Sequence, residues 1–110
     1  MHTGDDILEK LVRETTVQIK NGDGLHMRPA MQFVDLASQF DCEVTVSSGR
    51  VEADGKSIMN MSMLAATFGT QLKIRAAGPQ AEEALEALRE LVEVRMFDEP
   101  PPEANRNQPQ

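Results

Sequence analysis

The sequence predicts an α+β fold, an open-faced β-sandwich in which a four-stranded antiparallel sheet carries three helices on one face. Four segments alternate apolar and polar residues, which is the pattern of strands with one buried face. Three other segments repeat apolar residues at helical spacing, so that the order of elements is βαββαβα. Buried parallel strands would be apolar throughout, so the alternation favours an antiparallel sheet. The length of 110 residues fits one such domain.

An N-terminal extension, residues 1–14, is expected to form a short amphipathic helix. From Asp5 to Glu14 the apolar residues recur at helical spacing behind two acidic residues, which suit a helix N-terminus. The apolar side of this helix either packs back on the domain or pairs with another chain. The domain itself is predicted over residues 15–97. Its first strand is expected where apolar and polar residues alternate from Thr16 to Lys20.

The first domain helix is expected over Met27–Phe40. Its apolar residues share one face, and Pro29 falls in the first turn, where proline is tolerated. After this helix, the alternating runs Cys42–Ser47 and Arg50–Ala53 predict two strands. The residues Ser48–Gly49 between them predict a tight turn.

A second helix is expected after Ser57, a residue type that caps helix N-termini. Its core face is predicted to consist of four residues, Met61, Leu64, Ala65 and Phe68. The run Gln71–Ala76 predicts the fourth strand, and the last helix is expected after Gly78–Pro79. The remaining residues, 98–110, are acidic and rich in proline, and we expect them to form a disordered tail.

The composition excludes several kinds of function. The formal net charge is -7, from 18 acidic and 11 basic residues, so a nucleic acid partner is not expected. One cysteine and two histidines provide neither an internal disulfide nor a structural zinc site, and we expect no metal and no cofactor. No apolar run approaches the roughly 20 residues that span a bilayer, so membrane insertion is not expected. The N-terminus lacks the pattern of a signal peptide, which indicates a cytoplasmic protein.

The segment Gly24–Ala30 is the most informative one for function. His26 falls where a loop becomes a helix, beside backbone N–H groups without helical acceptors and the positive end of the helix dipole. These surroundings favour an adjacent anion and a neutral imidazole that can attack phosphorus. Arg28 adds a planar cationic donor set for the same anion. The spacing is equally compatible with a polar residue at a helix start and a solvated arginine.

A second informative segment is Asp54–Leu64, around the start of the second predicted helix. Ile58, Met59 and Met63 cannot all be buried if the predicted core face is right, and an exposed apolar patch suggests a partner surface. Methionine suits a surface that receives several partners, because its side chain repacks easily. The alternative is that these methionines fill gaps in an aromatic-poor core. Ser57 is either a helix cap or a phosphorylation site.

The two motifs together resemble those of the HPr family, the histidine-containing phosphocarrier proteins of the bacterial phosphoenolpyruvate-dependent sugar phosphotransferase system. They read Gly-Leu-His-x-Arg-Pro-Ala at Gly24–Ala30 and Gly-Lys-Ser-Ile-Met at Gly55–Met59. The resemblance, which extends over Thr15–Met96, implies that His26 accepts a phosphoryl group on Nδ1 from phospho-enzyme I. His26 would then pass the group to a sugar-specific IIA component, with Arg28 stabilising the phosphate. Such a protein is a phosphoryl-transfer carrier with a phosphohistidine intermediate, rather than an enzyme that acts on a free metabolite.

The resemblance also implies partners and regulation. Ser57 would be phosphorylated by an HPr kinase/phosphorylase where the source has one, and the chain would then also contact a transcriptional regulator. Two alternatives stay open, a regulatory phosphorelay through His26 and an interaction module, neither of them coupled to sugar transport. We expect a monomer. On its partner surface, position 27 is a methionine, where the family commonly has a small residue. That surface is predicted to comprise Met27, Met31, Ile58, Met59, Ser62 and Met63.

Overall fold

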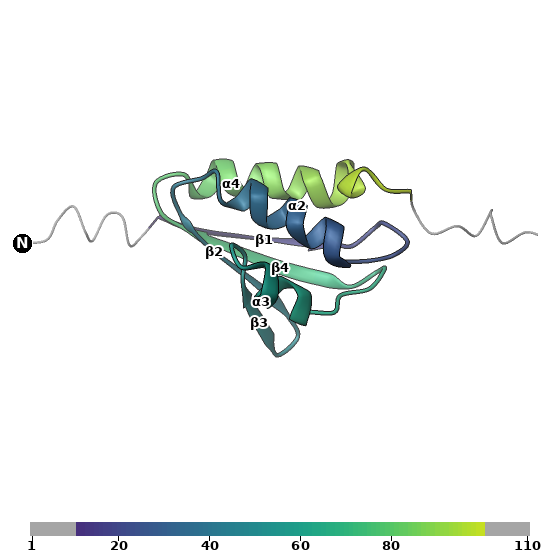
Figure 1. The fold of residues 1–110 in the computed structure, drawn as a ribbon. Helices are drawn as coiled ribbons and strands as arrows, with labels where there is room; N and C mark the ends of the chain where they lie inside the picture. The colour runs from purple at the N-terminus through teal and green to yellow at the C-terminus, as the bar shows by residue number, and fades with distance from the viewer. Residues whose placement is uncertain (1–10, 101–110) are drawn as a thin grey trace, which may run out of the picture.

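Figure 1 shows the computed structural model of the chain, which describes residues 11–100. The principal elements, in chain order, are β1 (Val12–Gln18), α2 (Met27–Ala37), β2 (Glu43–Ser48), β3 (Val51–Asp54), α3 (Ile58–Met63), β4 (Gln71–Ala77) and α4 (Ala81–Arg89). The predicted order βαββαβα is therefore confirmed, although α2 ends at Ala37 instead of Phe40. Within residues 11–100 no helix is long and apolar enough to cross a membrane.

The four strands form one antiparallel sheet in the order β1-β4-β2-β3. β4 lies inside the sheet, where it pairs with Val12–Gln18 of β1 on one side and with Glu43–Ser47 of β2 on the other. β2 and β3 form a hairpin, and Gly49 between them has a φ of +60°, which glycine adopts without steric cost. The antiparallel sheet predicted from the alternation is thus confirmed.

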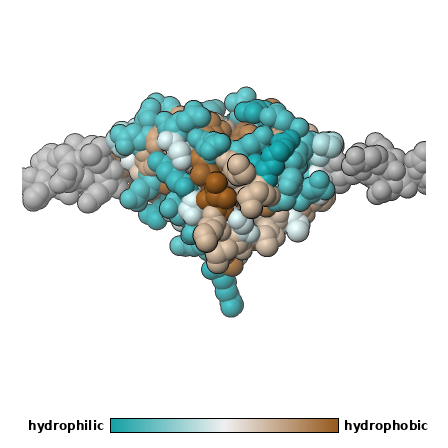
Figure 2. Space-filling model, viewed as in Figure 1, coloured by the Kyte–Doolittle hydropathy of each residue, from teal (hydrophilic) through white to brown (hydrophobic). Residues whose placement is uncertain are grey.

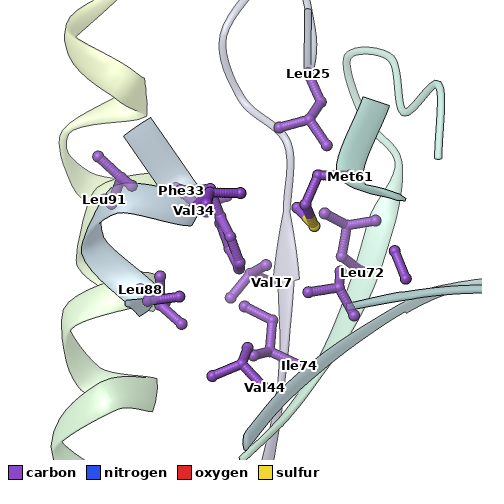
Figure 3. Close-up of a cluster of buried hydrophobic side chains, with 14 of the residues drawn as sticks. Val17, Leu25, Phe33, Val34, Val44, Met61, Leu72, Ile74, Leu88 and Leu91 are labelled. Carbon is purple, nitrogen blue, oxygen red and sulfur yellow. The ribbon is translucent and has the colours of Figure 1, made fainter. Parts of the chain in front are cut away.

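The helices cover one face of the sheet and leave the other to solvent. Along β4 every second side chain is buried, and the residues between them, such as Lys73 and Arg75, are exposed. Figure 1 shows α2 and α4 side by side over the sheet and α3 next to β3. In Figure 3, Phe33 of α2, Met61 of α3 and Leu88 of α4 belong to the same buried cluster as the strand residues. Each fully buried side chain of this kind contributes about 1.5–3 kcal/mol to stability.

The predicted N-terminal helix is wrong over its last residues. Val12–Glu14 lie in β1, where they pair with Arg75–Ala77 of β4. The Gly78 N–H also donates a hydrogen bond to the Leu11 carbonyl at 2.9 Å. Pairing with a neighbouring strand satisfies the backbone groups of this segment, and that outweighs helical spacing in a stretch too short to form a stable helix alone. The earlier part of the predicted helix, residues 5–10, lies outside the described residues.

The second predicted helix is shorter than expected, and only half of its predicted core face is buried. Met61 and Leu64 are buried as predicted, but α3 ends just before Leu64. Ala65 has a φ of +47°, which takes the chain out of the helix. As a result Ala66 is buried in its place, and Phe68 is 53% exposed. The predictions for Ala65 and Phe68 are therefore wrong, because helical spacing does not extend past the end of the helix.

Two further helical turns follow α4. α4 continues into a π-helical turn, η1 (Glu90–Val94), which is followed by a 3-10 turn, η2 (Met96–Asp98). All three residues of η2 have positive φ, at +52°, +55° and +60°, and this conformation costs a non-glycine residue about 1–2 kcal/mol. Phe97 is fully buried, which offsets part of this cost. Asp98–Pro100, which the sequence assigns to the tail, thus have defined positions, whereas residues 101–110 lie outside the described range.

Candidate functional site

The loop before α2 holds a conformation that requires glycine. Gly24 has a φ of +73°, and a Cβ atom at this position would lie 2.6 Å from the Ala66 carbonyl oxygen. The same oxygen accepts a hydrogen bond from the Leu25 N–H at 2.8 Å, so the loop is attached to the segment after α3. Asn21 is fully buried, and its Nδ2 donates to the Gly24 carbonyl at 2.8 Å. These contacts determine how the chain enters α2.

His26 is the N-cap residue of α2. Its backbone is extended, with φ -85° and ψ -168°, and its carbonyl oxygen accepts a hydrogen bond from the Ala30 N–H at 3.0 Å. Its side chain makes no capping hydrogen bond and is 42% exposed. The imidazole therefore stands at a helix N-terminus, where first-turn N–H groups lack helical acceptors and the dipole is positive. The predicted helix start, with Pro29 in the first turn, is confirmed.

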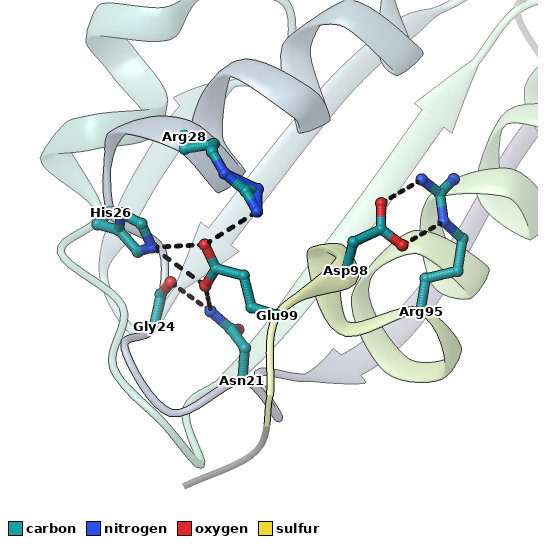
Figure 4. Close-up of polar contacts among 7 residues, drawn as sticks. All are labelled: Asn21, Gly24, His26, Arg28, Arg95, Asp98 and Glu99. Atoms are coloured by element: carbon teal, nitrogen blue, oxygen red, sulfur yellow. Dashed lines mark hydrogen bonds and ion pairs between the residues drawn. The ribbon is translucent and has the colours of Figure 1, made fainter.

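A carboxylate that the sequence analysis did not single out lies against His26. Both carboxylate oxygens of Glu99 lie within hydrogen-bond distance of His26 Nε2, at 2.9 and 3.1 Å. Asn21 Nδ2 donates to the same carboxylate at 2.9 Å, and Arg28 Nη2 lies 3.7 Å from it. Figure 4 shows Asn21, His26 and Arg28 converging on Glu99, and we call these four residues the Glu99 cluster. The anion beside His26 and Arg28 is thus a side chain of the protein itself, and the predicted binding of a phosphate there stays a prediction.

Glu99 was missed because it follows the last predicted helix, among acidic residues and prolines. The available signal was Phe97, a large apolar side chain beyond that helix, whose burial holds the following residues on the domain. Pro100 adds a backbone contact, because its carbonyl oxygen accepts a hydrogen bond from the Gly22 N–H at 3.0 Å. Both backbone and side-chain hydrogen bonds therefore attach the C-terminal segment to the His26 loop.

Ser57 is the N-cap residue of α3, as predicted. Its Oγ accepts hydrogen bonds from Asn60 N at 3.2 Å and from Asn60 Nδ2 at 3.1 Å. α3 contacts α2, so the Ser57 and His26 motifs begin two neighbouring helices. The prediction that Ser57 caps a helix is therefore confirmed. Its predicted phosphorylation stays a prediction.

The predicted partner residues are exposed on α2 and α3. Their exposed fractions are 56% for Met27, 44% for Met31, 38% for Ile58, 74% for Met59 and 73% for Met63, and we call these five residues the methionine patch. Ser62 is exposed as well, and its Oγ donates to the Ile58 carbonyl at 2.8 Å. Figure 2 shows apolar side chains gathered over the region where these two helices meet. Among the predicted α3 methionines only Met61 fills the core, so the gap-filling alternative does not explain the others.

Two further groups bear on metal binding and reactivity. Asp23, His26 and Glu99 each place one potential ligand atom within 4.8 Å of the others, a grouping that the sequence did not predict. Within this group, the Glu99 carboxylate is held by the hydrogen bonds from Asn21 and His26 described above. Cys42 is buried, and burial raises the pKa of its thiol, which keeps it protonated and poorly nucleophilic near neutral pH.

An open-faced sandwich with an exposed histidine at the start of its first domain helix is the architecture of a small histidine phosphocarrier. The family model described as "PTS HPr component phosphorylation site" matches residues 13–94. The phosphocarrier protein HPr of Vibrio cholerae is 44% identical over 80 residues, which cover 73% of this chain and 94% of that protein. The chain belongs to the HPr family, the phosphocarrier proteins of the phosphotransferase system.

Two further similarities extend this result. The phosphocarrier protein NPr of Escherichia coli is 42% identical over 74 residues, which cover 66% of this chain and 82% of NPr. The crystal structure of HPr-C-His from Thermoanaerobacter tengcongensis has a TM-score of 0.75 and 39% sequence identity, and the match covers 79% of this chain and 97% of that one. The fold and the family are therefore shown by sequence and structure alike.

Proposed function

We propose that His26 is the residue of this chain that carries the phosphoryl group. The observation that supports this best is the exposed imidazole at the N-terminus of α2, free of any capping bond and close to the Arg28 guanidinium. A carrier must be reached by its donor and by its acceptor in turn, and an open site allows both. We place this exchange in the cytoplasm, with phospho-enzyme I as the donor and a IIA component as the acceptor.

The transfer is a direct exchange between two imidazoles. The Nδ1 lone pair of His26 attacks the phosphorus atom, the P–N bond to enzyme I breaks, and its electron pair stays on the enzyme I nitrogen. The oxygens of the arriving group lie near the positive end of α2 and its free N–H groups. Arg28 supplies a second source of positive charge, because its guanidinium is solvent-accessible and lies 3.7 Å from the same Glu99 carboxylate that contacts His26.

The methionine patch is the proposed docking surface for enzyme I and the IIA components. It borders the His26 site through Met27, which directly follows His26 and is 56% exposed. Apolar contacts suit a chain with a net charge of -7, because they need no excess of basic residues on the carrier. Flexible methionine side chains also allow one surface to fit two different partners.

A regulatory relay is the second candidate function. The chain is 44% identical to a relative called HPr and 42% identical to one called NPr, so the comparisons favour neither branch. Both functions use the same chemistry at His26 and differ in the acceptor. Purified IIA components of the sugar and regulatory branches, offered to the phosphorylated carrier side by side, would separate them by transfer rate.

We also propose regulatory phosphorylation at Ser57. A phosphate on its Oγ would lie at the N-terminus of α3, next to Ile58 and Met59 of the methionine patch, and would oppose docking by its charge. Incubation with ATP and an HPr kinase should give an acid-stable phosphate that the Ser57→Ala variant lacks. Absence of label in the unaltered chain would leave Ser57 as a helix cap alone.

Labelling of the histidines tests the proposed carrier function. Incubation with labelled phosphoenolpyruvate and enzyme I should give one acid-labile phosphate per chain. His26→Ala should abolish the label, because the nucleophile is gone. The chain offers a matched control in its only other histidine, and His2→Ala should be labelled like the unaltered protein. Label that survives in His26→Ala would refute the proposal.

A further inference from the structure

We propose that Glu99 is a positioning residue for phosphoryl transfer, which holds the His26 ring with Nε2 protonated and Nδ1 available to the phosphorus atom. The inference rests on the proposed role of His26. Its basis is the shortest contact of the imidazole, the 2.9 Å hydrogen bond between Nε2 and a Glu99 oxygen. An ionised carboxylate accepts but cannot donate, so this contact requires the proton on Nε2. In the neutral imidazole Nδ1 is then the unprotonated nitrogen.

The Glu99 carboxylate is itself held firmly. The side chain is only 11% exposed, whereas the His26 side chain is 42% exposed. One oxygen accepts the hydrogen bond from Asn21 Nδ2, and Asn21 is fully buried. Arg28 lies 3.7 Å from the other oxygen. The carboxylate therefore has a fixed position against which a mobile, exposed ring can be oriented.

The backbone that carries Glu99 is strained in a way that supports a role at the site. The three preceding residues, Met96–Asp98, all have positive φ, and none of them is glycine. Strain of this kind persists only where surrounding contacts hold it, and here Phe97 is buried while Asp98 pairs with Arg95. These contacts turn the chain so that Glu99 faces His26.

The proposed contact also fits the transfer step. When Nδ1 forms its bond to phosphorus, the ring gains positive charge while Nε2 keeps its proton. The Glu99 carboxylate stabilises that charge through the existing hydrogen bond and takes no proton itself. The rate of phosphoryl transfer from phospho-enzyme I should therefore fall by at least about tenfold in Glu99→Ala, the lower end of the effect expected for one hydrogen bond to a charged group.

The test is NMR of the ring nitrogens and of the Nε2-bound proton of His26 in the unphosphorylated full chain, at a pH where the imidazole is neutral. In the unaltered protein we expect an unprotonated Nδ1 and an Nε2 proton protected from exchange with water. Glu99→Ala should lose this protection. Glu99→Gln, whose amide oxygen still accepts, should retain part of it and should transfer faster than Glu99→Ala. Glu86→Ala is the matched control, because Glu86 is an exposed carboxylate that pairs with Arg89 on α4 and not with His26.

The outcomes separate this inference from the proposed function. An unprotected Nε2 proton in the unaltered chain, or equal protection and equal transfer rates in all variants, would overturn the role of Glu99 even if His26 is labelled normally. Absence of the acid-labile phosphate from the unaltered chain after incubation with phosphoenolpyruvate and enzyme I would instead refute the carrier role. Unchanged backbone amide spectra would show that each variant retains the fold.

Discussion

His26 owes its position to a steric requirement two residues earlier in the chain. Gly24 combines a positive φ with a close approach to the Ala66 carbonyl, and the adjacent Leu25 N–H bonds to that same oxygen. The loop before α2 is therefore held by the segment after α3 through contacts to a single carbonyl oxygen. A side chain at position 24 would push these segments apart and move the imidazole.

Substitution of Gly24 tests this requirement. Gly24→Ala should lower the free energy of unfolding by about 2 kcal/mol or more, because the left-handed conformation costs about 1–2 kcal/mol and the Cβ atom also meets backbone. Gly49→Ala is the matched control, with a φ of +60° and open space around the Cβ position, and should lose only the conformational part. Urea denaturation measures both values. Equal losses would show that the contact with Ala66 is unimportant.

The residues of the site differ in how far the sequence could predict them. His26 and Arg28 were predictable because a helix start with proline in the first turn is a local pattern, and so was the cap at Ser57. Glu99 was not, because its contact with His26 joins residues 73 positions apart and depends on backbone angles that no local pattern encodes. Long-range polar contacts of this kind require the folded chain.

At the scale of elements, the C-terminal turns are as important for the site as α2. α4, η1 and η2 run along the sheet toward the His26 loop, and Glu99, which directly follows η2, lies against the ring. The elements of the sheet and helices were predictable from periodicity, since their apolar faces meet in one core. The failures at Val12–Glu14 and at Phe68 occurred where a neighbouring strand or the end of a helix overrode the local pattern.

Phe97 should anchor the C-terminal turns. Phe97→Ala removes a fully buried ring and should lower the free energy of unfolding by about 3–5 kcal/mol. Phe68→Ala is the matched control, because its ring is 53% exposed, and should change stability by no more than about 0.5 kcal/mol. Chemical denaturation measures both. Similar losses in the two variants would contradict the burial of Phe97 and the exposure of Phe68.

At the scale of the whole molecule, the proposed phosphoryl acceptor and the proposed docking surface share one region, while the opposite face of the sheet is polar. The methionine patch lies on α2 and α3, and His26 stands at the start of α2. A partner that covers the patch therefore also reaches the imidazole. This arrangement is suited to a small carrier that meets its donor and its acceptor one after the other through the same surface.

The central claim is that His26 receives the phosphoryl group on Nδ1. The most direct measurement is a long-range proton–nitrogen NMR spectrum of the chain, labelled with nitrogen-15 in its histidines and phosphorylated by enzyme I, with phosphorus couplings recorded. We expect coupling between phosphorus and Nδ1 of His26 and a proton retained on Nε2, which faces Glu99 in the structure. Coupling to Nε2, or no coupling to His26 in a chain that carries the phosphate, would contradict the account.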